Sequence, residues 1–227
     1  LLLADLGSEV TKVERPGIGD ETRDWKPPVD SEGRSTYFLS VNRNKSGLAL
    51  DLSKSADQAR ARELILASDV VIENFGAGGM AKFGLDYKSL KDLKPDLIYC
   101  SITGFGSSEI AAQLPGYDML VQAMSGLMHV TGAESGEPTK AGVAVIDVIA
   151  GLHACTGILA ALRARDEQGI GQQPRPVRRE AQQIVAVGAV AVQQHHEMPR
   201  LAASMRPMAR SLQLGHSFLL QSGMLRR

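Results

Sequence analysis

The order of the apolar stretches along the chain limits the possible folds more than any other feature. Residues 10–14, 69–73 and 97–102 are apolar runs of strand length, and residues 56–67 and 88–94, which lie between them, have helical spacing. Strands that alternate with helices predict a parallel sheet covered by helices on both faces. We therefore expect an α/β fold with an open, Rossmann-like parallel sheet. Ligands should bind at the carboxyl ends of its strands, where loops lead into helices.

The charge balance excludes several classes of partner. The chain of 227 residues has 25 basic and 25 acidic side chains, so it lacks the basic field that draws proteins to nucleic acids or acidic membranes. No apolar run reaches the ~18 residues of a membrane span, and no charged segment precedes the opening leucines as in a signal peptide. We expect neither a nucleic acid nor a membrane partner.

The two cysteines bear on location and on metal binding. Cys100 and Cys155 lie in apolar segments rather than in a paired motif, which suits buried thiols in a reducing compartment. The sequence shows no cluster of metal ligands. We expect a cytoplasmic protein, or one of the mitochondrial matrix if the source is eukaryotic.

Both ends of the chain depart from the organised middle. The opening residues look like the last turns of a helix that Gly7 closes, which predicts a truncated N-terminus. After Gln172 the composition changes: residues 173–227 have no lysine and only two acidic residues, Glu180 and Glu197. The scattered arginines argue against a basic arm for RNA or an acidic partner, although that alternative stays open. We expect residues 1–172 to form a partial domain and 173–227 to be an atypical tail, either translated in a shifted frame or disordered.

Glycine-rich loops follow three of the predicted strands, at residues 15–20, 74–79 and 104–106. Glycine lets a backbone approach a ligand closely, although such loops are more often plain turns. None of the three has the spacing of a dinucleotide fingerprint or of a P-loop. The sequence therefore disfavours both of these common phosphate sites.

Asp147 stands where the apolar run 143–146 meets a helix-periodic stretch, which carries apolar residues at Val148, Ile149, Leu152, Cys155, Leu159 and Leu162. The first-turn N–H groups and the helix dipole favour an ionised carboxylate at such a position. Asp147 is therefore either a plain helix cap or a carboxylate held ready to react.

Five motifs, taken in order, resemble the class III CoA-transferases, the family of formyl-CoA transferase and carnitine CoA-transferase. The resemblance covers residues 1–172. It rests on Lys-Val-Glu-Arg-Pro-Gly-Ile-Gly-Asp-Glu-Thr-Arg (12–23), Asn-Arg-Asn-Lys-Ser (42–46), Glu-Asn-Phe (73–75) with Gly84-Leu85, Gly-Tyr-Asp (116–118) and Ala-Gly-Val-Ala-Val-Ile-Asp (141–147). Segments 103–106 and 125–132 most resemble the members that use dicarboxylates, of the succinyl-CoA:glutarate type.

The resemblance implies an enzyme that moves coenzyme A between carboxylic acids, with acyl-CoA and an acid as substrates and no permanently bound cofactor. It implies that Asp147 attacks the thioester to give an aspartyl anhydride and then an aspartyl-CoA thioester, a form of covalent catalysis. It also implies site residues: Arg15 and Lys82 as CoA phosphate or adenine contacts, Leu50, Asn74 and Phe75 as nucleotide-pocket lining, and Tyr37 and Tyr117 near the acyl group. Without the resemblance, the two cations would be surface charges and the apolar residues core.

Two other functions remain open. An acyl-CoA racemase of the same fold would need a histidine base, and Gly116-Tyr117-Asp118 has tyrosine where that branch carries histidine. A tyrosine with a reference pKa of about 10 is a poor base near neutral pH. The second alternative is a nucleotide-binding module without catalysis.

The resemblance ends at Gly169-Ile170-Gly171-Gln172, where the family pattern continues with an apolar-Asp-apolar strand and this chain has Gln-Pro-Arg-Pro. Family members have a second half that covers the intermediates, and they form interlocked homodimers. We therefore expect the chain as given to be poorly active, although its parent is an enzyme.

Overall fold

The computed structural model describes residues 1–76, 78–106, 114–134, 136–168 and 210–214. Five parallel strands form one sheet in the order β2-β1-β5-β3-β4. The strands are β1 (Glu9–Glu14), β2 (Lys45–Ala49), β3 (Val70–Glu73), β4 (Ile98–Ser101) and β5 (Arg210–Leu214). The predicted α/β class with an open parallel sheet is confirmed.

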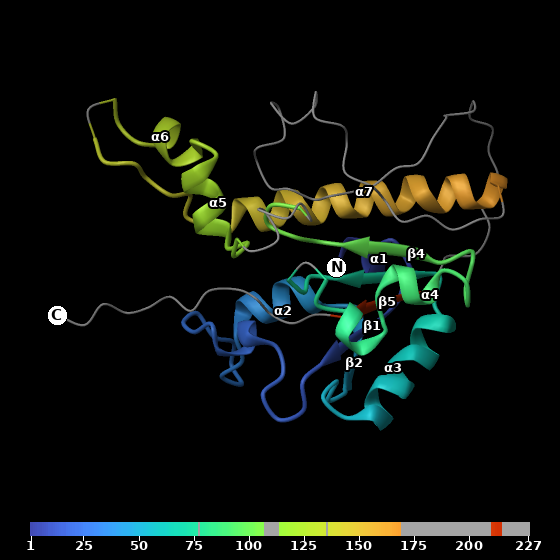
Figure 1. Ribbon diagram of the computed structural model, residues 1–227. Helices are drawn as coiled ribbons and strands as arrows, with labels where there is room; N and C mark the ends of the chain where they lie inside the picture. Colours follow the sequence, from blue (N-terminus) through green and yellow to red (C-terminus); the bar gives the residue numbers. More distant parts are fainter. Residues whose placement is uncertain (77, 107–113, 135, 169–209, 215–227) are drawn as a thin grey trace.

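Helices cover both faces of this sheet (Figure 1). The longest, α7, lies along one face, and α3 and α4 lie on the other. The helices are α1 (Leu2–Asp5), α2 (Thr36–Asn42), α3 (Ser55–Leu66), α4 (Tyr87–Leu90), α5 (Asp118–Met124), α6 (Leu127–Thr131) and α7 (Val145–Gln168), with short 3-10 turns at Glu21–Asp24 and Ala81–Phe83. The predicted helix 56–67 corresponds to α3, whereas the predicted helix 88–94 is only the single turn of α4. The predicted helix end at Gly7 is also present, because Gly7 has a φ of 97° directly after α1.

Neighbouring residues of the central strands belong to different cores. On β3, Val70 packs under α7 with Ile158, while Val71 packs on the opposite face with Ile65 of α3. Successive side chains of a strand point to opposite faces, so a strand covered on both sides must be apolar at every position. This is why residues 70–72 and 98–100, which make up most of β3 and β4, appear in the sequence as continuous apolar runs.

α7 buries only some of the apolar positions noted in the sequence, since Cys155 and Leu162 pack against the sheet-side core. Ala154, Ile158 and Ala161 pack on the sheet, whereas Val148, Leu152 and Leu159 are 57%, 49% and 45% exposed. The helix is apolar on every side, so its periodicity could not show which side faces the sheet. By length and mean hydropathy (1.9), Val145–Glu167 could also cross a membrane, although core helices pass the same test and this one packs partly on the sheet.

β5 was not expected from the sequence. It lies between β1 and β3 and pairs in parallel with both, so that Leu212 is in register with Thr11 on one side and Val71 on the other. β5 therefore joins two strand pairs, β2-β1 and β3-β4, into one sheet. The rest of the predicted 173–227 tail lies outside the described residues.

Candidate functional site

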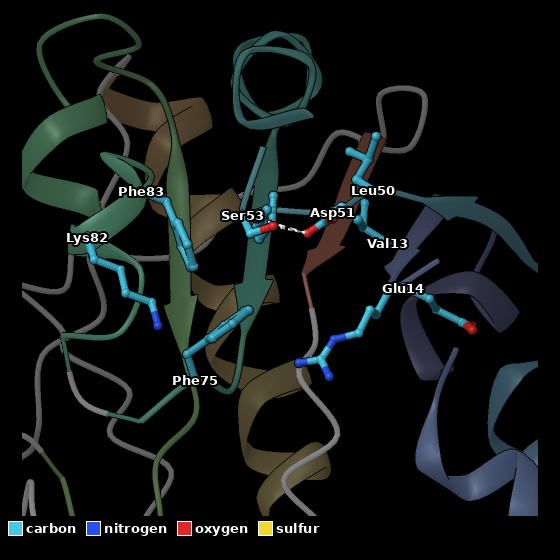
Figure 2. Close-up of a pocket in the computed structure, with 10 residues that line it drawn as sticks. Val13, Glu14, Leu50, Asp51, Ser53, Phe75, Lys82 and Phe83 are labelled. Atoms are coloured by element: carbon cyan, nitrogen blue, oxygen red, sulfur yellow. Dashed lines mark hydrogen bonds between the residues drawn. The ribbon is translucent and has the colours of Figure 1, made fainter. Parts of the chain in front are cut away.

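A cavity of about 430 Å³ opens at the carboxyl ends of β1, β2 and β3, the edge of the sheet at which the sequence predicts ligand binding (Figure 2). Its lining residues are Val13, Glu14, Arg15, Leu50, Asp51, Leu52, Ser53, Phe75, Lys82 and Phe83. The structure thus brings together four residues predicted to contact CoA: Arg15, Leu50, Phe75 and Lys82. The fifth, Asn74, is half-buried directly before Phe75 and is not part of this lining.

One side of the cavity combines aromatic rings with a cation. Phe75 and Phe83 meet edge to face with ring centroids 6.3 Å apart, and Lys82 Nζ lies 4.8 Å from the centroid of Phe83. Figure 2 shows these three side chains on one side and Leu50 and Asp51 on the other. A flat ring that stacks on the aromatic side and an anion that meets the cation would both fit here.

A buried hydrogen bond fixes the turn that carries Phe75. The buried carboxylate of Glu73, at the end of β3, accepts a hydrogen bond of 2.8 Å from the Phe75 N–H. Burial raises the pKa of Glu73, although its bonds to Ser101 and to the Phe75 amide act in the opposite direction. Gly79 closes the same turn, since a Cβ there would lie 2.8 Å from the Gly76 oxygen and 3.0 Å from Phe75 Cβ. The predicted glycine-rich loop is therefore a compact turn that presents Phe75 to the cavity.

Ion pairs hold the loop that follows β1. Buried Lys12 contacts Asp20 at 2.5 Å and Glu14 at 3.3 Å, and Arg23 binds Glu14 at 2.9 Å. Burial alone would raise the pKa of Asp20, but the Lys12 ammonium and the Thr22 donors lower it to about 2. The motif at 12–23 thus folds into an internally paired loop that positions Arg15 at the cavity.

The surroundings of Asp147 differ from the expectation in one respect. Asp147 lies in the first turn of α7 as predicted, but the Ile146 and Asp147 N–H groups donate to Asp118 Oδ1, at 2.7 and 3.2 Å. Asp147 Oδ2 is buried and, among the described residues, has no hydrogen-bond partner. Burial, and then the charge of Asp118, raise the pKa of Asp147 to about 7. The expectation that the helix start favours ionisation of Asp147 is therefore wrong, because burial disfavours the charge and Asp118 accepts from the N–H groups that would have stabilised it.

The two predicted tyrosines approach this region from separate helices. Tyr37 of α2 is half-buried beside Trp25, and burial, then the charges of Asp147 and Asp118, raise its pKa. Tyr117 precedes α5 and is next to Asp118. Its backbone is held by a close approach of two glycines, because a Cβ on Gly104 would lie 2.1 Å from the Gly116 Cα. The loop after β4 and the Gly-Tyr-Asp motif therefore touch backbone to backbone.

Asp118 and Gln122 are site residues that the sequence did not predict, and they are 4% and 1% exposed. Gln122 Nε2 donates to Asp118 Oδ2, and Gln122 Oε1 accepts from the Ala141 N–H at 2.9 Å. The available signal was that Asp118 ends the Gly-Tyr-Asp motif and Gln122 follows four residues later, on the same face of a helix.

The other titratable groups do not form a metal or base site within the described part of the chain. No group of three or more His, Cys, Asp and Glu side chains there could hold a metal ion. A racemase would need a histidine base. The two candidates, His129 and His153, are exposed on α6 and α7.

Comparison with known proteins gives a single family. The family model described as "CoA-transferase family III" matches residues 1–202, which extends beyond Gln172. A succinate–glutarate CoA-transferase of Agrobacterium fabrum is 48% identical over 176 residues, covering 75% of this chain and 44% of that protein. The human succinyl-CoA:glutarate CoA-transferase is 46% identical over 170 residues, covering 74% of this chain and 38% of its own length.

A crystal structure of a CAIB/BAIF family protein from Brucella suis has the same fold. It matches with a TM-score of 0.71 at 47% identity, and the match covers 75% of this chain and 46% of the other. The chain thus spans less than half the length of the relatives it matches.

Proposed function

The chain belongs to CoA-transferase family III, and from this we propose that its parent protein transfers coenzyme A from an acyl-CoA donor to a dicarboxylic acid, with Asp147 as the nucleophile. The similar relatives are named for succinate, glutarate and mesaconate, which supports a dicarboxylate acceptor. We also propose that the substrates are acyl-CoA and free acid, and that the intact protein is a homodimer without a nucleic acid partner.

The observation that carries this proposal is the buried, unpartnered Oδ2 of Asp147 within the described part of the chain. A buried polar atom without a partner is rare and calls for an explanation. A carboxylate that is poorly solvated and has a pKa raised to about 7 is more basic, and so more nucleophilic, than an ordinary aspartate. Because this pKa lies close to neutral pH, a useful fraction of Asp147 is still ionised there.

In the proposed reaction, an Asp147 oxygen attacks the thioester carbonyl carbon and the C–S bond breaks, which releases the CoA thiolate. The thiolate then attacks the Asp147 carbonyl, so that the donor leaves as a carboxylate and an aspartyl-CoA thioester remains. The acceptor carboxylate repeats the two attacks in reverse order, which forms the new acyl-CoA and regenerates Asp147. Every step is an acyl exchange, so no electrons are gained or lost.

We propose that the cavity at the ends of β1, β2 and β3 holds the nucleotide end of CoA. Phe75, Phe83 and Leu50 supply apolar surface for adenine, while Arg15 and Lys82 supply positive charge for phosphates. We further propose that Tyr37 and Tyr117 lie near the acyl group, because Tyr37 interacts electrostatically with Asp147 and Tyr117 is next to Asp118.

A test is to mix the chain with succinyl-CoA and hydroxylamine and to measure free CoA. Hydroxylamine also cleaves succinyl-CoA directly, so CoA release is compared with a mixture without protein. A transferase should give a stoichiometric burst of CoA above this background as hydroxylamine intercepts the acylated Asp147, and Asp147→Asn should give only the background. A module that only binds nucleotides would bind CoA without a burst, and that result would refute the proposal.

The second test measures turnover with succinyl-CoA and a panel of acids. The chain spans less than half of its relatives, so we expect turnover far below that of a full-length relative. Equal turnover, lost in Asp147→Ala, would overturn this expectation of weak activity while supporting the transferase itself.

A further inference from the structure

The first turn of α7, which carries Asp147, is capped by a side chain of α5 and not by a residue next to it in the sequence. Asp118 Oδ1 accepts from two first-turn amides of α7, those of Ile146 and Asp147. Helix starts leave such N–H groups without intrahelical partners, and a side-chain oxygen usually satisfies them from the cap residue itself. Here the cap comes from a separate helix earlier in the chain.

Gln122 holds Asp118 in place and reaches a second segment. Its Nε2 donates to Asp118 Oδ2, and its Oε1 accepts from the Ala141 N–H at 2.9 Å. Both oxygens of Asp118 and both polar atoms of the Gln122 amide are therefore occupied. Because the two side chains are 4% and 1% exposed, water cannot easily replace any of these bonds.

We propose that Asp118 and Gln122 are a positioning pair, which fixes the first turn of α7 and leaves Asp147 Oδ2 without a hydrogen-bond donor among the described residues. This inference rests on the proposed function of Asp147 as nucleophile. Asp118 occupies the N–H groups that would otherwise solvate Asp147, and it adds a negative charge beside it. The pair therefore keeps the nucleophile basic and fixed in direction at the same time.

The charged and titratable groups near Asp147 are few in the described chain. Asp118 of α5 is the group whose charge acts on Asp147 after burial itself, and Tyr37 of α2 faces both carboxylates. Asp20 also acts on Tyr37. A change in the titration of Asp147 that follows a substitution in α5 can thus be assigned to Asp118, provided that Tyr37 and Asp20 are unchanged.

The chain allows a sharp rescue experiment, because the pair is one carboxylate and one amide. Asp118→Asn alone places two NH₂ groups against each other or leaves the Ala141 amide unpaired. The double variant Asp118→Asn/Gln122→Glu exchanges the two groups: the new amide caps α7 and donates to the new carboxylate, which also accepts from Ala141. Net charge and all four hydrogen bonds are kept, while the charge moves away from Asp147. Met119→Ala, on the exposed side of α5, is the matched control.

The first readout is amide hydrogen exchange, which needs no transferase activity. In Asp118→Ala, the Ile146 and Asp147 amides should exchange at least about tenfold faster, as expected for a lost buried hydrogen bond. Exchange of the distant Ala161 amide should not change, and the double variant should restore protection at the α7 start. Unchanged exchange at Ile146 and Asp147 in Asp118→Ala, or equal acceleration along all of α7, would overturn the proposal.

The second readout is the titration midpoint of the Asp147 carboxyl, followed by ¹³C NMR. The midpoint should move toward lower pH in Asp118→Ala and in the double variant, and stay in place in Met119→Ala. A purely structural role would restore both readouts in the double variant, so a midpoint that returns with the cap would contradict the part of the proposal that concerns charge. Absence of any CoA burst in the wild-type chain would refute the transferase but not the positioning pair, since neither readout depends on acylation.

Discussion

At the scale of single residues, Asp147 is held in a state that costs stability. Its side chain is partly removed from water next to the negative Asp118, and its Oδ2 has no partner among the described residues. Groups held in such a state are common at active sites, where stability is exchanged for reactivity. The sequence pattern correctly placed this residue at a helix start. It could not show the raised pKa, because the main cause is burial and the second is Asp118, which lies 29 positions away in the chain.

Asp147→Asn should therefore stabilise the protein in a pH-dependent manner. Burial and Asp118 raise the folded-state pKa to about 7, above the ~3.9 of an unfolded aspartate. The folded state then binds the proton more tightly, so this contribution to stability is complete below about pH 4 and is lost as the pH rises through about 7. Urea unfolding should show the variant about 2 kcal/mol more stable at pH 8, with little difference at pH 4. Equal unfolding free energies at pH 8 would show that Asp147 is not destabilised by its surroundings.

Gly116→Ala tests the close backbone approach at the Gly-Tyr-Asp motif. A Cβ at Gly116 would lie 2.7 Å from both the Cα and the N of Gly104, and backbone on both sides cannot easily move. We expect a loss of about 2 kcal/mol in unfolding free energy, in the range of overpacked sites. Gly151→Ala is the control, since nothing lies within 4 Å and alanine favours the α7 helix by about 0.5–1 kcal/mol. If both substitutions stabilise the protein, the two loops do not meet as described.

At the scale of elements, α7 shows where sequence patterns lose information. Three strands, β1, β3 and β4, could be located because their apolar runs are too short for a helix and rich in valine or isoleucine. The sheet-facing side of α7 could not, because Val148, Leu152 and Leu159 are as apolar as the residues that pack. The distinction came from size: alanines at 154 and 161 let the helix approach the sheet closely.

Two neighbouring positions on α7 should respond differently to truncation. Ile158 is 1% exposed and contacts the sheet-side core, whereas Leu159 is 45% exposed. Ile158→Ala should cost about 2–5 kcal/mol in unfolding free energy, as for other buried aliphatic residues, and Leu159→Ala within about 0.5 kcal/mol. Thermal or urea unfolding of the pair checks this. A larger loss at Leu159 would mean that α7 is rotated about its axis or covered on its outer side.

β5 is one of the elements that the sequence did not predict, as is β2. Its five residues follow a segment of unusual composition, and local patterns cannot detect that a distant segment fills the gap between β1 and β3. Leu212→Pro should remove a ladder N–H at the centre of the sheet and reduce stability by about 3 kcal/mol or more. Leu212→Ala, which keeps that N–H, serves as the control, and unfolding curves for both decide the outcome. Equal stability of Leu212→Pro and Leu212→Ala would mean that residues 210–214 do not pair within the sheet.

At the scale of the whole molecule, two features lie at the same edge of the sheet. The cavity proposed for CoA lies at the ends of β1, β2 and β3, and the α7 start with Asp147 lies at the edge where β4 ends and α5 begins (Figure 1). Fold class, family and four of the residues that line the cavity followed from ordered motifs in the sequence, because each motif is local. The Asp118–Gln122 pair and β5 did not, because both join segments distant in sequence.

The most direct test of the central claim is to find acyl or CoA label on Asp147 itself. The chain is incubated with succinyl-CoA, trapped with hydroxylamine, digested, and the peptide that contains Asp147 is analysed by mass spectrometry. The account predicts a hydroxamate at Asp147 in the wild-type chain and in Met119→Ala, and none in Asp147→Asn. An unlabelled Asp147, or the same label on another carboxylate in Asp147→Asn, would contradict it.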